Sequence, residues 1–353
     1  MNHYPDPSRH WRSPRALARA REASLTIARA ELRRRRAAGA VGRQVFGDAH
    51  DGAGHTAYFR DELLPLVRTL PAGFRVMEIG AGMGWHAAMM AAHGAGAVIA
   101  TEVLWDGDTP WSPGNVSTFR RLCEREPELS RVMRFTDAGS INFPAALHFA
   151  RAKAEFLPAA DASLDLVYTY NCAEHIPGLR DYCAEAARVL RIGGVFHTST
   201  EPLYYSPYGH HLWDIFPAPW AHLLWAAPEF ATVALQEAGE DREWSPGVRL
   251  EPAHIHALLV EGMNYARPRD IRDALRPGPW RIEGWLDIAP QSNIELAKEL
   301  GIREALRGIH DEDLLLTGLR IRLRRTPTAE GLRLPMRFPM TTRRALRRVV
   351  PRW

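Results

Sequence analysis

The sequence predicts a doubly wound α/β fold, in which helices cover both faces of a mostly parallel sheet. An apolar run leads into a glycine-rich turn and then a helical pattern at residues 75–93. Strand and helix patterns alternate from there to Thr200, which is typical of parallel strands joined by right-handed crossovers. Two further strand patterns, at residues 280–288 and 314–325, bring the expected sheet to seven strands.

Each of the other elements is predicted from the spacing of its apolar residues. Helical patterns place apolar residues three and four positions apart, and glycines mark several of the expected helix ends. The predicted helices cover residues 14–38, 57–69, 85–93 and 179–190. The remaining predicted strands are short apolar runs at residues 97–103, 147–152, 164–171 and 194–200.

The chain is expected to divide into three parts. Residues 1–70 would form a basic helical N-terminal extension, residues 71–326 the α/β domain, and residues 327–353 a basic C-terminal tail. An aromatic, proline-rich insertion follows the fifth strand, at about residues 203–265. Long connections in compact domains are usually functional, so we expect this insertion to form a lid over the substrate.

Charge is distributed unevenly along the chain. Met1 to Arg43 carries +8 and Leu319 to Trp353 carries +10, which leaves −14 for the body of a chain with net charge +4. Basic ends are attracted to anionic lipid or nucleic acid, although solvated helices and tails give the same pattern. The C-terminal tail is expected to form a basic amphipathic helix that contacts an anionic membrane.

The composition predicts a cytoplasmic protein, with peripheral contact to the membrane as an option. Its three cysteines fit neither a disulfide framework nor a thiolate zinc site, and this indicates a reducing compartment. The N-terminus lacks the apolar core of a signal peptide, and no run reaches the ~18 apolar residues of a membrane span. No metal is expected.

The glycine-rich turn is the strongest candidate binding site. Its sequence is EIGAGMG, from Glu78 to Gly84, and glycines there let the backbone approach a ligand closely. A dinucleotide fold would require G-x-G-x-x-G, but Trp85 stands at the sixth position and would crowd a pyrophosphate. Glu78 would also repel phosphate, so the turn favours a cationic sulfonium ligand with a free amino group.

A second carboxylate lies where a ribose would be bound. Glu102 follows Gly84 at the end of the second predicted strand, and a carboxylate at that position can accept hydrogen bonds from two ribose hydroxyls. A surface acid at a strand end is the alternative.

These motifs, in this order, resemble the class I S-adenosylmethionine-dependent methyltransferases, in the branch that acts on small molecules, lipids and sugars. The resemblance covers EIGAGMG, TEV, AEFLPAADASLDLVYTYNCAEHI and RDYCAEAARVLRIGG, between Arg75 and Glu201. It implies a Rossmann-like, mostly parallel seven-stranded sheet that ends in a hairpin, with S-adenosyl-L-methionine as the cofactor.

The resemblance also implies roles for individual residues. Those expected around the cofactor are Glu78, Gly80, Ala81, Gly82 and Gly84 for its amino acid part, Glu102 for the ribose, Ala154 and Glu155 beside the adenine, and Asn171 and Cys172 at the methyl-transfer cavity. Lys153 departs from the family pattern, which often has an acid there, and Asp137 competes for the adenine contact.

The acceptor side is predicted from the segment YYSPYGHHLWD, just past the fifth strand. His210 and His211 are the candidate general bases, because imidazole titrates near neutrality, and Asp214 would orient them. The aromatic walls would be Tyr205, Tyr208, Trp213 and Trp220. A packed aromatic lid with structural histidines is the alternative.

Three further histidines are candidates for contact with the ligands. His175 would follow the fourth strand beside Glu174 and contact substrate, or be structural, while His50 and His55 would close over the cofactor or belong to a flexible loop. The leading hypothesis is O-methylation of a saccharide or another hydroxylated metabolite. The alternatives are a nucleic-acid methyltransferase, which the Asn-Cys-Ala-Glu sequence after the fourth strand disfavours, and a non-catalytic scaffold docked through its basic ends.

Overall fold

The computed structural model describes residues 4–39, 53–103, 120, 123–124, 126–135, 141–240, 243–245 and 248–328. The chain forms two compact units. The first contains residues 1–50, 200–271 and 287–319, and the second contains residues 51–199, 272–286 and 320–353. The N-terminal helix therefore shares a unit with the insertion that follows the fifth strand, whereas the expected division placed it in a separate extension.

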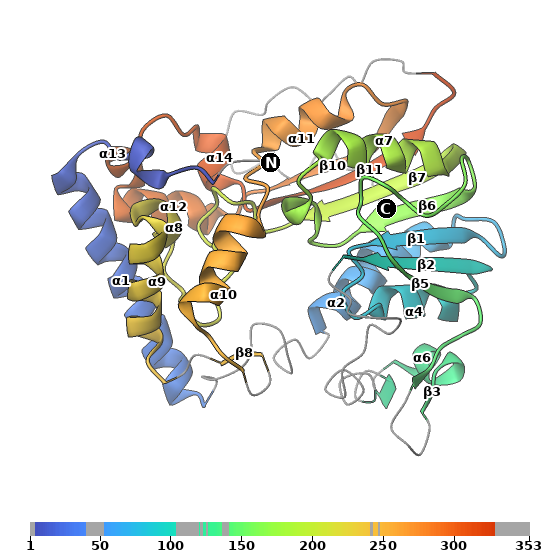
Figure 1. Cartoon of the computed structure of the whole chain (residues 1–353), viewed down its shortest axis with the longest axis horizontal. Helices are drawn as coiled ribbons and strands as arrows, with labels where there is room; N and C mark the ends of the chain where they lie inside the picture. The colour runs from blue at the N-terminus through green and yellow to red at the C-terminus, as the bar shows by residue number, and fades with distance from the viewer. Residues whose placement is uncertain are drawn as a thin grey trace. The chain divides into compact units, whose positions relative to one another are not determined.

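A seven-stranded sheet forms the centre of the second unit (Figure 1). Its strand order is β10-β11-β7-β6-β1-β2-β5. The strands are β1 (Arg75–Ile79), β2 (Ala97–Glu102), β5 (Leu147–Arg151), β6 (Leu164–Thr169), β7 (Leu190–Thr200), β10 (Trp280–Ile288) and β11 (Gly318–Arg325). The pairs β1–β2, β1–β6, β2–β5 and β6–β7 are parallel. These observations confirm the predicted fold class.

The edge formed by β10 and β11 is antiparallel. The amide of Thr317 donates to the Ile288 carbonyl over 2.8 Å, and the amide of Thr326 donates to the Pro279 carbonyl over 2.7 Å. The start of β11 therefore lies beside the end of β10. β11 is also antiparallel to β7. Arg324, near the end of β11, donates to the carbonyl of Gly193, near the start of β7, over 2.7 Å.

Helices cover both faces of this sheet, and Figure 1 shows α4 and α7 on opposite sides. On one face, Tyr182 of α7 donates to the hydroxyl of Thr198 over 3.1 Å. On the other, the ring of Tyr58 lies 6.0 Å from that of His197, the preceding residue of β7. The remaining elements of this unit are α2 (Ala53–Tyr58), η2 (Phe59–Leu63), α3 (Leu64–Val67), α4 (Trp85–Ala92), α6 (Pro127–Val132), β3 (Arg134–Phe135), β4 (Ile141–Asn142), η3 (Ala173–His175) and α7 (Leu179–Val189).

Three predicted boundaries shift for identifiable reasons. The helix expected over residues 57–69 begins at Ala53 and changes to a π-helical turn, η2, before α3; Pro65 lacks the amide that a continuous α-helix would use there. β7 begins at Leu190 rather than Gly194, because Leu190 already pairs with Leu164 ahead of a bulge. β11 begins at Gly318 because α14 occupies the preceding residues.

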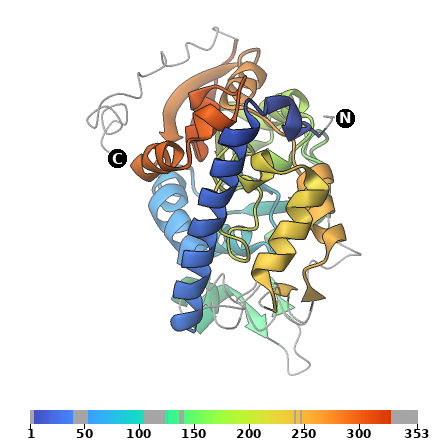
Figure 2. The same cartoon turned by 90° about the vertical axis from the view of Figure 1, so that its left-hand side faces the viewer.

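The first unit is mainly helical, and Figure 2 shows α1 running beside α8 and α9. Ser13 caps α1, with its hydroxyl accepting from the amide of Ala16, and Pro14 occupies the first turn. The elements of this unit are η1 (Pro7–His10), α1 (Pro14–Ala37), α8 (Ala221–Leu224), α9 (Ala227–Ala238), β8 (Glu243–Ser245), β9 (Val248–Arg249), α10 (Pro252–His256), η4 (Ala257–Glu261), α12 (Gln291–Leu300), α13 (Ile302–Ala305) and α14 (Asp311–Leu315). α11 (Pro268–Leu275) spans the boundary between the units.

The core of the first unit buries the apolar stripe of α1 against the insertion. Leu17, Ala20 and Ala28 belong to the same apolar cluster as Trp220 and Phe230. Burial of such side chains stabilises by roughly 25 cal/mol per Å² of apolar surface. Within the described residues, no helix combines the length and the hydropathy needed to cross a membrane.

Candidate cofactor site

The glycine turn joins β1 to α4 in a conformation that few other residues adopt. Gly80, Gly82 and Gly84 have φ angles of +69°, +51° and +73°, all in the left-handed region that favours glycine. The amide of Ala81 donates to the carbonyl of Thr101 over 2.9 Å, which ties the turn to the end of β2. The turn therefore lies at the carboxyl ends of two adjacent parallel strands.

Gly80 is required for a second reason. A Cβ atom at this position would lie 2.1 Å from Sγ of Cys172, the residue that follows the end of β6. Cys172 therefore packs directly against the turn.

Glu102 is fixed at the mouth of the turn by backbone donors. Its Oε2 accepts from the amide of Gly82 over 3.2 Å, and its Oε1 accepts from the amide of Val103 over 2.7 Å. A carboxylate oxygen has two lone pairs and can accept from more than one donor. This geometry suits the expected contact with two neighbouring hydroxyls.

Glu78 lies inside the protein, with a relative exposure of 2%. Its Oε1 lies 3.3 Å from Nδ1 of His86, and its Oε2 has no hydrogen-bond partner among the described residues. Burial raises the pKa of Glu78 to about 8, and the charge of Glu102 adds to this, while the nearby Tyr168 hydroxyl and the Ala87 amide oppose it. Glu78 thus offers a buried oxygen atom that a cationic ligand would satisfy.

The thiol of Cys172 is influenced by the charges of four carboxyl groups. Burial raises its pKa well above the usual value, and the charges of Glu174, Glu102, Glu78 and Glu155, in that order, raise it further. The thiol is therefore neutral, which excludes it as a thiolate nucleophile. A cluster of acids around an uncharged group favours a cation in the same space.

Asn171 has a left-handed backbone, with φ +46°. Its Oδ1 accepts from the hydroxyl of Ser199 over 3.1 Å, and its amide donates to the Ser199 carbonyl over 3.1 Å. β7 therefore positions this residue just after the end of β6; the role at the methyl-transfer cavity that the family resemblance implies for it stays a prediction.

The residues expected near the adenine differ in their burial and in the hydrogen bonds that they already make. Ala154 is buried, with 6% exposure. Glu155 already accepts from the amide of Gly178 over 3.0 Å, just before α7. Lys153 is exposed, as is Phe156 beside it, at 76%. Asp137 lies outside the described residues, so the adenine contacts stay a prediction.

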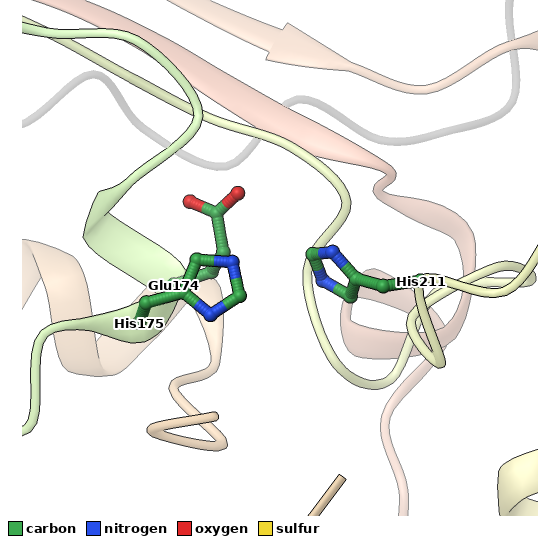
Figure 3. A group of neighbouring side chains, drawn as sticks. All are labelled: Glu174, His175 and His211. Carbon is green, nitrogen blue, oxygen red and sulfur yellow. The ribbon is translucent and has the colours of Figure 1, made fainter. Parts of the chain in front are cut away.

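The two residues expected after the fourth strand lie on the short turn η3. Figure 3 shows the side chains of Glu174 and His175 projecting from this turn. Glu174 is buried and His175 is partly buried. The contact of His175 with substrate stays a prediction. His50 lies outside the described residues.

Sequence reasoning missed His86, which is the most informative residue of the site. It lies on α4, buried at 3%, and its Nε2 is 3.2 Å from the carbonyl oxygen of His55 on α2. Burial lowers the pKa of His86 to about 4. A histidine within the otherwise apolar helix WHAAMMAA was the available signal.

The first unit contains the residues predicted for the acceptor side, and the geometry contradicts the role expected of His210. This histidine is fully buried. Its Nε2 donates to the carbonyl of Ala218 over 3.1 Å, and its Nδ1 accepts from the amide of Leu212 over 3.0 Å. Both ring nitrogens are thus engaged, and burial lowers the pKa well below its usual value. His210 is a structural histidine, because no nitrogen is left to accept a substrate proton.

The aromatic residues of the insertion differ in exposure. Trp220 is buried and donates to the carbonyl of Tyr205 over 3.1 Å, and Tyr205 is itself 5% exposed. Trp213 is 48% exposed, with the guanidinium of Arg35 4.5 Å from its ring centroid. Trp213 is therefore the better candidate for a wall that touches substrate, and Tyr205 belongs to the core. His211 has a left-handed backbone in the same loop.

Comparison with protein-family models gives a match to part of this chain. Residues 112–198 match the profile of a family described as "Methyltransferase domain". No curated protein matches the chain significantly.

Several solved structures are similar in fold. An S-adenosylmethionine-dependent methyltransferase from Mesorhizobium loti is 18% identical, with 74% of this chain and 96% of that chain covered and a TM-score of 0.38. Geranyl diphosphate C-methyltransferase from Streptomyces coelicolor A3(2) is 13% identical, with 76% and 78% covered and a TM-score of 0.39. The [4+2]-cyclase SpnF is 18% identical, with 75% and 80% covered and a TM-score of 0.38. These values are too low to assign an activity.

The family match and the strand order agree with each other. Residues 112–198 are similar to a methyltransferase domain, and the strand order is that of a Rossmann-like, mostly parallel sheet with an antiparallel edge. The buried, unsatisfied oxygen of Glu78, the left-handed glycine turn and the fixed carboxylate of Glu102 fit S-adenosylmethionine as the cofactor.

Proposed function

We propose that the protein is an S-adenosylmethionine-dependent methyltransferase that methylates an oxygen of a saccharide or another hydroxylated small metabolite. The observation that supports it best is the group of carboxylates around Cys172, next to the glycine turn. This arrangement favours a cationic ligand and disfavours a phosphate.

Each part of the site has a distinct task in this proposal. Glu78 binds the ammonium group of the cofactor through Oε2. The glycine turn lets the backbone approach the carboxylate of the cofactor. Glu102 binds the two ribose hydroxyls. When bound, the cofactor supplies a methyl group on sulfur: a carbon–oxygen bond forms on the acceptor as the carbon–sulfur bond breaks.

The chain must also align the acceptor and remove its proton. Alignment in such a displacement contributes much of the rate. With His210 engaged on both sides, His211 is our candidate base, and Trp213 our candidate wall for a sugar ring, because its ring is half exposed. His175 is the candidate for a further substrate contact. The described residues contain nothing that favours a nucleic-acid acceptor or a non-catalytic scaffold.

Replacement of Glu102 tests the proposal. We expect Glu102→Gln to weaken S-adenosylmethionine binding about 10- to 100-fold, since a hydrogen bond to a charged group contributes roughly 1.5–3 kcal/mol. Titration calorimetry measures the affinity, and turnover is followed with methyl-labelled cofactor on pools of hydroxylated acceptors. The matched control is Glu240→Gln, whose side chain is 91% exposed and pairs only with Arg249 among the ion pairs described. Absence of binding by the unmodified protein would refute the proposal.

A further inference from the structure

The ring of His86 lies between two oxygen atoms that ordinarily accept hydrogen bonds. Nδ1 is 3.3 Å from Oε1 of Glu78, and Nε2 is 3.2 Å from the carbonyl oxygen of His55. A neutral imidazole has one N–H and one lone pair. The carbonyl can only accept, so Nε2 carries the hydrogen, and the lone pair of Nδ1 then needs a donor.

That donor is the carboxyl group of Glu78. A proton on Oε1 completes the hydrogen bond to Nδ1, and it agrees with the direction of both pKa values, raised to about 8 for Glu78 and lowered to about 4 for His86. Without a ligand, the pair therefore consists of a carboxylic acid and a neutral histidine. A neutral Glu78 holds an ammonium group poorly, so binding of a cation requires the proton to leave the carboxyl group.

Resting on the function proposed above, we propose that His86 is a positioning residue that holds Glu78 and accepts its proton when the ammonium group of the cofactor binds. The O–H bond at Glu78 Oε1 breaks and an N–H bond at His86 Nδ1 forms. The imidazolium then has an acceptor at each nitrogen, Oε1 of Glu78 and the His55 carbonyl. The carboxylate presents Oε2 to the ligand, and the total number of bound protons does not change.

The groups that face this pair come from four neighbouring elements. His86 is contacted by rings from α2 and from the segment after β6, and Glu78 is influenced by groups on β6 and β2. These groups are His55, Tyr58, Tyr170, Cys172, Tyr168 and Glu102. Burial raises the pKa of Tyr168 and of Tyr58 well above the usual value, so neither phenol takes up or releases a proton near neutral pH.

Calorimetry in two buffers of different ionisation enthalpy counts the protons exchanged on binding. The measurement is made between pH 6 and 7, below the roughly 7.7–8.0 at which a free α-amino group titrates, with S-adenosylmethionine and S-adenosylhomocysteine as ligands. We expect the unmodified protein to release no proton and to bind with an affinity that is independent of pH in this range.

The variant His86→Asn fills the Nδ1 position with an amide that cannot take up a proton. Its Glu78 must lose the proton to solvent, so we expect close to one proton released per ligand and an affinity that rises about tenfold per pH unit. His93→Gln, at the end of the same helix and away from Glu78, is the matched control and should behave like the unmodified protein. Nitrogen-15 NMR of the His86 ring should show the second N–H only in the ligand-bound state.

The outcomes separate this inference from the function on which it rests. If the unmodified protein binds neither nucleoside at any pH, the proposed function is wrong. If it binds and releases a proton, or if His86→Asn binds without releasing one, the transfer to His86 is wrong although the cofactor site stands. The proton count of the unmodified protein decides between these outcomes even if the variant does not fold.

Discussion

At the scale of single residues, the site depends on short-range steric and electrostatic constraints. Gly80 is the clearest case, because its left-handed backbone and the sulfur of Cys172 exclude a side chain at the same position. Gly82 shares the backbone conformation, but no atom within 4 Å would meet a Cβ there. A substitution of Gly82 therefore reports backbone strain alone, whereas a substitution of Gly80 reports backbone strain and steric overlap together.

We predict that Gly80→Ala lowers stability by about 3 kcal/mol or more, whereas Gly82→Ala costs about 1 kcal/mol. An L-residue in the left-handed region costs roughly 1–2 kcal/mol, and Gly80→Ala adds the overlap with Cys172. Urea denaturation measures both values. In the double variant Gly80→Ala/Cys172→Ala, part of the loss should be recovered, because the sulfur is gone while the Cβ of residue 172 remains. Additive losses would show that the overlap is relieved elsewhere.

Some site residues can be predicted from the sequence and others cannot. Glu78, the glycines and Glu102 can be proposed from the sequence because one local strand–turn–helix segment and the next strand carry them. His86 was missed because its partners, Glu78 and the backbone of His55, are set by packing between two helices and a strand. His210 was misassigned for the converse reason: the sequence cannot show that the backbone of Ala218 and Leu212 occupies both of its nitrogens.

At the scale of elements, the parallel strands were the easiest to predict. Strands buried on both faces are continuous apolar runs, and β6 is buried at every position. α1 was predicted as a helix, but its apolar stripe is interrupted by arginines. Its sequence therefore resembles that of a solvated extension, and its inclusion in the core of the first unit depends on contacts far away in the chain.

We predict that Ser24→Ala destabilises the protein by about 1–2 kcal/mol. The buried hydroxyl of Ser24 on α1 donates to the carbonyl of Pro219 over 2.8 Å, and its loss leaves that carbonyl unsatisfied, at a cost of roughly 1–3 kcal/mol. The better helix propensity of alanine offsets about 0.5 kcal/mol.

Thr26→Ala is the control on the same helix. Its exposed hydroxyl donates only to the carbonyl of Glu22, one turn back, so its removal should change stability by less than about 0.5 kcal/mol. Equal effects of the two substitutions in chemical denaturation would mean that α1 does not depend on its contact with the insertion.

At the scale of the whole molecule, the described residues of the two units include four buried neutral histidines. Burial lowers the pKa of His86 to about 4, those of His197 and His222 to about 3, and that of His210 well below its usual value. Each is uncharged when folded, but takes up a proton near pH 6.5 when unfolded. The unfolded chain therefore binds more protons below that pH, and stability falls as the pH falls.

Glu78 acts in the opposite direction. Its pKa is raised to about 8 in the folded state, so its contribution to stability is present at low pH and is lost as the pH rises from about 4.5 to 8. Between pH 4.5 and 6.5 the four histidines outweigh this one carboxyl group. Above about pH 7 Glu78 outweighs the four histidines, so the combined contribution of these five residues to stability is greatest near pH 7.

We predict that stability measured by urea denaturation falls steeply below pH 6.5, and that His197→Gln makes this fall shallower. One fewer buried histidine removes up to about 1.4 kcal/mol per pH unit from the slope. His197 is the informative position, because neither ring nitrogen has a partner among the described residues and the charges of Arg322 and Arg320 also lower its pKa. His256→Gln is the control: the side chain is 60% exposed and should leave the slope unchanged. An identical slope in both variants would mean that His197 gains a proton in the folded state, which would require water or a rearranged neighbour within that buried layer of the sheet.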